Sequence, residues 1–259
     1  MQVENTTQEP KFTMPTETID LPSKGLVYPE GNPLSTGKIE MKYMGAKEED
    51  ILTNQSYIAN GTVLDKLMQA LIVTKINYDD LIVGDKNAIM IAARVLGYGK
   101  DYAFEYNSEI QTVDLSQLDT KEFDETLLLE KGKNEFIYVL PSTGIEITYK
   151  ILTHGDEKKI QAELDGLKKI NKTNSPELST RLKFMITSVG GERDTKAIRE
   201  FVDKHLLAMD SRALRKHIKE TQPDVDLTFF PEGSSNRVDI PVGVKFFWPD
   251  LWYSPSNEG

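Results

Sequence analysis

The chain has 259 residues, with 41 acidic and 31 basic side chains, a formal net charge of −10 and no cysteine. The acidic balance argues against nonspecific binding to nucleic acid or to an anionic membrane surface, and the lack of cysteine excludes disulfides, a thiolate nucleophile and a cysteine-based zinc site. No stretch approaches the roughly 20 apolar residues of a membrane span, and the polar N-terminus lacks a signal-peptide pattern, so we expect no membrane span and a cytoplasmic protein.

Residues 1–36 are predicted to form an extended N-terminal arm. Residues 1–20 are rich in Thr, Glu and Gln and should be flexible, whereas residues 21–36 are dense in Pro, Gly and Ser. Proline fixes φ near an extended or turn value, and glycine reaches conformations that other residues avoid, so this part should form a defined, non-regular segment that contacts something. We predict as partner contacts Leu21, Pro22, Lys24, Gly25, Tyr28 and Pro29.

Residues 37–153 are predicted to form a mixed domain of strands and helices. Residues 38–44 alternate as a half-buried strand with Ile39, Met41 and Tyr43 on one face. Residues 48–60 have a helical pattern. Two more helices should follow, one beginning at Thr62 with a capping-box pattern and one capped by Asp85.

The strand signals of this domain indicate an antiparallel element. Tyr102, Phe104 and Tyr106 alternate, and residues 136–140 and 145–151 are two further strands joined by a four-residue turn. Residues 111–125 have weak periodicity and many acids, which predicts an irregular connection.

Beyond Thr153 the pattern becomes helical. Four amphipathic helices in succession predict a helical subdomain over residues 154–222, with Ile186 and Val189 on the apolar face of the second helix. Asp194 should cap the third helix, and Asp210 or Ser211 the fourth. Residues 223–259 are predicted to form a β-rich C-terminal segment that is rich in aromatic side chains, which completes an α+β fold.

The residues that could carry catalysis are sparse. His205 and His217 lie on successive predicted helices and could meet, but a metal site needs a third ligand, so structural or solvent-facing roles are favoured for the histidines. The glycine-rich stretches LGYGKDY and GDKN lack the fingerprints of dinucleotide and phosphate binding. We therefore predict no catalytic residue, no cofactor and no metal site.

Two further groups are candidates for binding a partner. Arg212 and Arg215 share one side of a predicted helix, where they could dock an acidic partner or pair with local carboxylates. The C-terminal aromatic cluster offers Phe247, Trp248 and Pro249 as contacts, because aromatic residues dominate interface hot spots. Packing of this cluster on its own domain is an equal alternative.

Four segments carry a resemblance to a known family. The stretches LPSKGLVYPEGNPLSTGKIEMKYMGAKEEDIL, VGDKNAIMIAARVLGYGKDY, DSRALRKHIKE and IPVGVKFFWPD, in this order, resemble the T4-type bacteriophage baseplate hub and hub-assembly proteins over residues 20–250 or so. Members of that family often carry a Cys-x-x-Cys element just before the final stretch. Here the corresponding residues are FFPEGSSNRVD, so a metal-stabilised ribbon is not expected.

The resemblance implies a virus-encoded, non-enzymatic protein that helps to build the baseplate hub of a contractile tail. Its partners would be other baseplate or hub proteins, with a homo-oligomer possible, and it would lie in the host bacterial cytoplasm during assembly and in the virion tail baseplate if it is structural. The alternative is a transient hub-assembly chaperone that is absent from the mature virion. An enzyme, such as a cell-wall hydrolase, would need a convergent histidine and acid site, which the sequence does not indicate.

Overall fold

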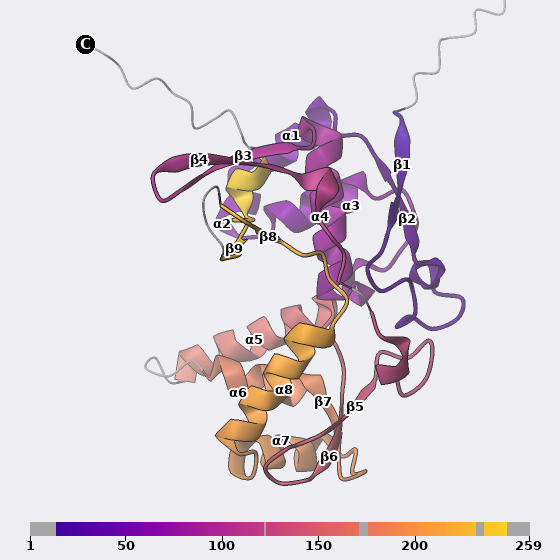
Figure 1. Ribbon diagram of the computed structural model, residues 1–259, viewed down its shortest axis with the longest axis vertical. Coiled ribbons are helices and arrows are strands. Elements are labelled where there is room, and N and C mark those ends of the chain that lie inside the picture. Colours follow the sequence, from indigo (N-terminus) through magenta and orange to yellow (C-terminus); the bar gives the residue numbers. More distant parts are fainter. Residues whose placement is uncertain (1–13, 122, 171–175, 232–235, 248–259) are drawn as a thin grey trace, which may run out of the picture.

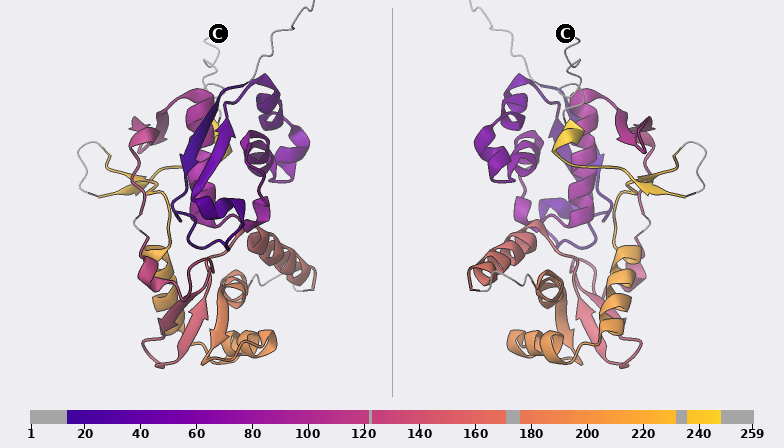
Figure 2. Two further views of the ribbon diagram at one scale, coloured as in Figure 1. Left: turned by 90° about the vertical axis from the view of Figure 1, so that its right-hand side faces the viewer. Right: turned by 90° about the vertical axis from the view of Figure 1, so that its left-hand side faces the viewer.

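The computed structural model describes residues 14–121, 123–170, 176–231 and 236–247, and its fold is mixed α+β with small antiparallel sheets. The helices and strands form two lobes (Figure 1). The upper lobe holds β1–β4, α1–α4, β8 and β9, and the lower lobe holds β5–β7 and α5–α8. The side views of Figure 2 show the same division, with the β8–β9 hairpin projecting from the upper lobe.

The first sheet of the upper lobe pairs β1 (Thr16–Asp20) with β2 (Lys38–Lys42) in antiparallel register, from Thr16 opposite Lys42 to Asp20 opposite Lys38. The alternation predicted for β2 is confirmed, because Ile39 and Met41 are buried while their neighbours are not. The predicted flexibility of residues 1–20 is wrong for β1. Its backbone groups find partners on β2, and its threonine and isoleucine side chains suit a strand.

Four helices pack beside this sheet. They are α1 (Ala46–Leu52), α2 (Gln55–Ala59), α3 (Val63–Leu71) and α4 (Val83–Tyr98). The single helix predicted over residues 48–60 is divided, because the Asn54 side chain accepts from the backbone N–H groups of Ser56 and Tyr57 and so begins α2. Thr62 precedes α3 as predicted, but its side chain makes no capping bond.

A hairpin of β3 (Asp101–Tyr106) and β4 (Glu109–Asp114) projects from the same lobe (Figure 1). The predicted strand around Tyr102 is confirmed. The irregular connection predicted from residue 111 is wrong at its start, which belongs to β4. No residue of β4 is fully buried, so its sequence lacks the apolar alternation that identifies a half-buried strand.

The lower lobe packs helices on a three-stranded antiparallel sheet of β5 (Phe136–Val139), β6 (Glu146–Tyr149) and β7 (Ile186–Val189). The predicted β5–β6 hairpin is confirmed. β7 was predicted as part of a helix. Its β-branched residues instead pair with β6, so this sheet joins strands from both sides of residue 153.

The four helices predicted after Thr153 are present, with corrected bounds. They are α5 (His154–Ile170), α6 (Glu177–Met185), α7 (Thr195–Lys204) and α8 (Ala208–Thr221). Asp194 caps α7 as predicted, since its carboxylate accepts from the N–H of Ala197. In the described part of the chain, no helix has the length and apolar character needed to cross a membrane.

After α8 the chain returns to the upper lobe. It forms β8 (Thr228–Phe229), β9 (Val238–Asp239) and a 3-10 turn, Val244–Phe247. Phe246 packs edge-on against Tyr102 with a centroid distance of 4.7 Å, and the Tyr102 hydroxyl donates to the Pro241 carbonyl at 3.0 Å. The end of the described chain is therefore part of the core of the upper lobe.

Candidate functional site

Residues 21–37, here called the arm loop, fold back on the upper lobe and do not extend from it. Leu21, Pro22, Gly25 and Tyr28 are buried, and successive turns close through hydrogen bonds from Lys24 N–H to the Leu21 carbonyl (2.8 Å) and from Tyr28 N–H to the Gly25 carbonyl (3.2 Å). The predicted extended arm is corrected here, because the apolar side chains of the segment fill a core. Only Lys24 and Pro29, among the six residues predicted as contacts, are exposed.

A buried carboxylate fastens the arm loop to α4. Asp85 has no exposed area and accepts three hydrogen bonds, from the Ser23 N–H (3.0 Å), the Ser23 hydroxyl (2.7 Å) and the Tyr28 hydroxyl (2.6 Å). Asp85 was predicted to cap α4, but the cap position is Ile82, whose N–H donates to the Tyr28 oxygen at 3.2 Å. Asp85 instead lies in the first turn, where the helix dipole favours a negative charge.

Burial dominates the protonation behaviour of this group. It raises the pKa of Asp85, and the hydrogen bonds from Tyr28 and Ser23 oppose that rise only in part. The pKa of the Tyr28 phenol is also raised, first by burial and then by the neighbouring Asp85. Tyr28 therefore stays a hydrogen-bond donor, and the link between loop and helix is held by neutral donors around one acid.

Two glycines let the arm loop cross itself at close range. Gly25 has φ +77°, and a Cβ atom there would lie 2.4 Å from the Ser35 carbonyl oxygen. Gly37 has φ +70°, and its Cβ would lie 2.7 Å from the Lys24 carbonyl carbon. Both positions require glycine, because φ is positive and because a Cβ atom would clash with nearby backbone. The backbone course of the arm loop next to Lys24 is therefore fixed.

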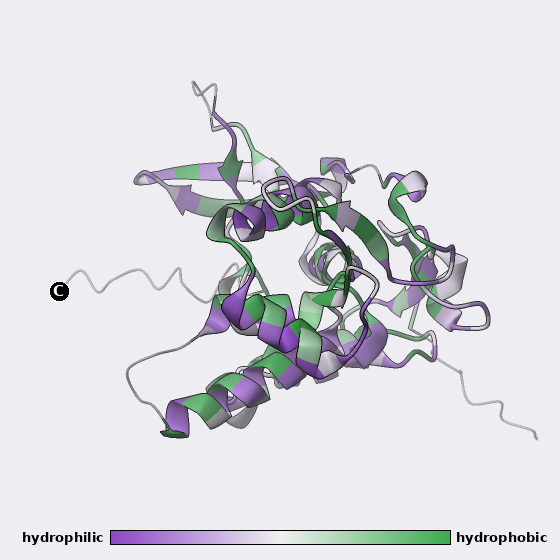
Figure 3. Cartoon of the chain, turned by 90° about the horizontal axis from the view of Figure 1, so that it is seen from below, coloured by the Kyte–Doolittle hydropathy of each residue, from purple (hydrophilic) through white to green (hydrophobic). Residues whose placement is uncertain are grey.

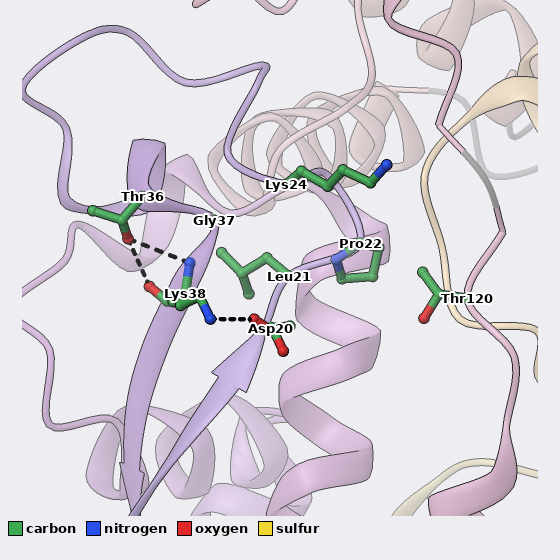
Figure 4. A pocket seen from close by; sticks show the side chains of 8 residues that line it. All are labelled: Asp20, Leu21, Pro22, Lys24, Thr36, Gly37, Lys38 and Thr120. Atoms are coloured by element: carbon green, nitrogen blue, oxygen red, sulfur yellow. Dashed lines mark hydrogen bonds and ion pairs between the residues drawn. The ribbon is translucent and has the colours of Figure 1, made fainter.

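The outer side of the arm loop borders two shallow pockets. The first has a volume of about 400 Å³ and lies between the loop, the ends of β1 and β2 and a distant segment that contributes Thr120. In Figure 4, Pro22 and the Lys24 side chain face Thr120 across it, and Lys38 pairs with Asp20 at 3.1 Å.

The second pocket, of about 420 Å³, is bordered by Tyr28, Glu30 and Lys131 and again by Lys24. Lys24 thus stands at the rim of both pockets, where its ammonium group can donate to carboxylate or carbonyl oxygens of a bound segment.

The predicted arginines of α8 are exposed on the lower lobe. Arg215 Nε donates to the Ser211 carbonyl at 3.3 Å, and neither Arg212 nor Arg215 pairs with a carboxylate of the described residues. Pairing with local carboxylates, the alternative for these two residues, is thus not seen in the described ranges. Their neighbour Lys216 lies 3.7 Å from Glu220.

Asp210 was predicted as a cap of α8, and this is wrong. Leu207 holds the cap position, and the buried Asp210 accepts from the Ser142 N–H (2.7 Å) and the Thr143 hydroxyl (2.9 Å) of the β5–β6 turn. Burial acts to raise the pKa of Asp210, but these hydrogen bonds outweigh it and hold the pKa below its usual value.

The C-terminal contact prediction is changed by burial. Phe247 has no exposed area and packs edge-on against Phe246 at 5.3 Å, so its side chain contributes to the core and not to a free surface. The alternative of packing on its own domain applies to it. Trp248 and Pro249 lie outside the described residues.

The three histidines have different surroundings. His217 stacks on Tyr138 at 4.4 Å, whereas His205 is exposed at the end of α7. His154 packs edge-on against Tyr78 and lies 3.3 Å from the Lys86 ammonium. In the described ranges no three histidine, aspartate or glutamate side chains are grouped so that they could hold a metal ion.

A scan against protein-family models and searches of curated proteins and solved structures found no match to this chain.

The sequence reasoning missed Ser23 and the true role of Asp85. These two residues are 62 positions apart, and no local pattern connects them. The available signal was a serine within a Pro- and Gly-rich segment together with an acid in the first turn of an apolar helix. Each feature has an ordinary local explanation.

Proposed function

We propose that this chain is a non-enzymatic component of a bacteriophage baseplate hub that acts through protein–protein interfaces. The observation that carries the proposal is the arm loop, which is fastened by Asp85 and two close glycine contacts and keeps Lys24 and Pro29 exposed. Fixing a surface loop in advance reduces the entropy lost when a partner binds it. This arrangement suits a permanent contact surface.

The baseplate assignment is supported by where the resembling segments lie. The stretch beginning at Leu21 meets the stretch beginning at Val83 through the Ser23, Tyr28 and Asp85 hydrogen bonds. The stretch beginning at Ile240 meets the end of the second one through Tyr102. Three of the four segments that resemble the hub and hub-assembly proteins therefore form one packed unit. This is expected if the three segments were kept together as one structural unit.

Within this proposal the partners are other baseplate or hub proteins, and each lobe offers them a separate surface. The upper lobe offers the arm loop, and the lower lobe offers the exposed arginines of α8. A homo-oligomer would use the same surfaces.

Quantitative mass spectrometry of purified particles and of fractionated infected-cell lysate tests this function. We expect the chain at a fixed ratio to known baseplate proteins in the particles. A chain that cosediments with hub intermediates but is missing from particles would instead be the transient assembly chaperone. A chain found in neither fraction would contradict the proposal.

A further inference from the structure

The lower lobe carries an apolar groove that the proposed function does not yet use. It has a volume of about 330 Å³ and lies where α6, α7 and α8 meet. Its lining includes Leu178, Leu182, Val202, Leu206, Ala208 and Ser211. Seen from below, the helices of this lobe carry apolar and polar bands side by side (Figure 3).

Large apolar side chains at and around this groove remain in contact with solvent. Leu178 is 46% exposed on the groove itself, and Leu207 and Met209, at the start of α8, are 49% and 73% exposed. Apolar groups that gather at a concave surface mark an interaction site more reliably than single exposed residues do. The Ser211 hydroxyl at the groove is also buried and without a hydrogen-bond partner among the described residues.

The charged side chains next to the groove differ in whether they form ion pairs with described residues. Glu177, which lines the groove, pairs with Arg181 at 3.4 Å, and Asp203 on α7 pairs with Lys183 at 2.7 Å. Elsewhere in the chain, ion pairs with carboxylates are formed by Arg181, Arg193, Arg199 and Arg237. Arg212 and Arg215 do not do so within the described ranges.

Helix geometry places these two arginines beside the groove. Arg212 follows Ala208 by four positions, and Arg215 follows Ser211 by four, so each lies one turn along α8 from a groove residue. Guanidinium groups bind carboxylates through paired hydrogen bonds. The surface therefore combines an apolar groove with two neighbouring arginines that pair with no carboxylate of the described residues.

We propose that this groove docks an acidic amphipathic helix of a partner protein. The apolar face of that helix would occupy the groove, and its carboxylates would pair with Arg212 and Arg215. A groove between helices suits a helical ligand with anchors at positions i, i+3, i+4 and i+7. The inference rests on the proposed function, because it names the chemistry of one partner segment.

Fluorescence anisotropy with the purified full-length chain tests this proposal. The probe is a labelled helical peptide of about 18 residues with leucines at i, i+3, i+4 and i+7 and glutamates on both flanks. The control peptide has lysine in place of each glutamate. We expect the acidic peptide to bind at least about tenfold more tightly than the basic one, with an affinity that falls as salt is added.

Three variants separate a groove site from general charge attraction. Arg212→Glu with Arg215→Glu, and Leu178→Ser alone, should each weaken binding by about tenfold or more. Lys47→Glu with Lys66→Glu makes the same change in net charge on exposed helix positions of the upper lobe, and it should change the affinity by less than about twofold. Thermal melting of each variant confirms that it is folded.

The proposal is overturned if the basic peptide binds as well as the acidic one, if neither binds, or if the α8 variant binds as the wild type does. These results require no phage particle. The baseplate assignment can therefore fail while the groove still binds, and the groove can fail while the chain is still found in baseplates.

Discussion

At the scale of single residues, the structure depends on acids that act far from their place in the sequence. Asp85 joins α4 to the arm loop, and Asp210 joins α8 to the β5–β6 turn. The donors to Asp85, Ser23 and Tyr28, are buried, whereas the donors to Asp210 lie on an exposed turn. Removing the Asp85 acceptor therefore costs more than the bond itself, since its former partners remain buried.

Replacing Asp85 tests this directly. Asp85→Ala leaves the Ser23 N–H, the Ser23 hydroxyl and the Tyr28 hydroxyl without their acceptor, so we expect the free energy of unfolding to fall by roughly 3 kcal/mol. Asp85→Asn should cost less, about 2 kcal/mol, because its amide oxygen can still accept from the Ser23 N–H, while its NH2 group replaces the oxygen that accepts from the Ser23 and Tyr28 hydroxyls. Urea unfolding measures both values. Equal losses in the two variants would mean that the charge itself is required.

The partly buried histidines, His154 and His217, predict how stability depends on pH. Burial lowers the pKa of His217, and burial together with Lys86 lowers that of His154. Groups with a lowered folded pKa stabilise the protein above their unfolded value of 6.5, and this contribution is lost as the pH falls through the folded value. Asp85, whose pKa is raised, has the opposite sign.

We therefore expect His217→Gln to reduce the loss of stability between about pH 7.5 and about pH 5.5. His205→Gln is the matched control, since His205 is exposed and the partly buried rings of His154 and His217 stay in place. Unfolding in urea at both pH values gives the comparison. If His217→Gln loses as much stability between the two pH values as the wild type does, the His217 ring does not contribute to the pH dependence.

The roles of single residues were the hardest feature to predict from the sequence. Asp85 and Asp210 both precede apolar helical runs, where an acid is most often a cap, and Asp194 at an equivalent place is one. What separates them is a partner from a distant segment. Local patterns carry no information about such a partner. By contrast, the exposure of Arg212 and Arg215 follows from helical spacing.

At the scale of elements, the arm loop is shaped by its glycines. Gly25→Ala would place Cβ 2.4 Å from a backbone oxygen at a positive φ, so we expect a loss of roughly 3 kcal/mol or more. Gly31→Ala is the control. Its φ of +85° is also strained, but no atom lies within 4 Å of the added Cβ, so about 1 kcal/mol should be lost. Similar melting temperatures for the two variants would contradict the close crossing.

Most elements could be predicted from apolar periodicity, and the failures have clear causes. β2, β3 and β5 alternate because one face of each is buried, whereas the last three residues of β6 are all buried. β4 is missed because it has no fully buried face. β7 is missed because its four residues directly follow α6, so the apolar spacing of the helix runs into the strand. Only the pairing with β6 identifies it.

At the scale of the whole molecule, the two lobes are joined where several chain segments meet. The backbone N–H of His154 donates to the backbone carbonyl of Leu81 at 2.8 Å, and Ile82 forms a β-bridge with Thr153. A Cβ atom at Gly84 would lie 1.9 Å from the Pro223 carbonyl oxygen, so the segment after α8 also passes close by. The arm loop and the α8 groove are therefore held on one body, as a protein that joins two partners would need.

This placement changes which residues report on the proposed interface. Tyr28 and Phe247 are buried, so replacing them would test folding. Lys24 is exposed at the rim of both arm-loop pockets, and Lys24→Glu reverses its charge without removing a buried contact. We expect the stability of this variant to stay within about 0.5 kcal/mol of the wild type. Lys47→Glu, on the exposed side of α1, is the matched control.

Under the proposed function, the most direct measurement is electron microscopy of tails from infections in which the phage gene encodes Lys24→Glu, Lys47→Glu or the wild-type chain. If the arm loop is a contact surface for hub assembly, Lys24→Glu should give incomplete baseplates and few finished tails, and Lys47→Glu should resemble the wild type. Normal baseplates in normal yield from a folded Lys24→Glu chain would contradict a role for this surface.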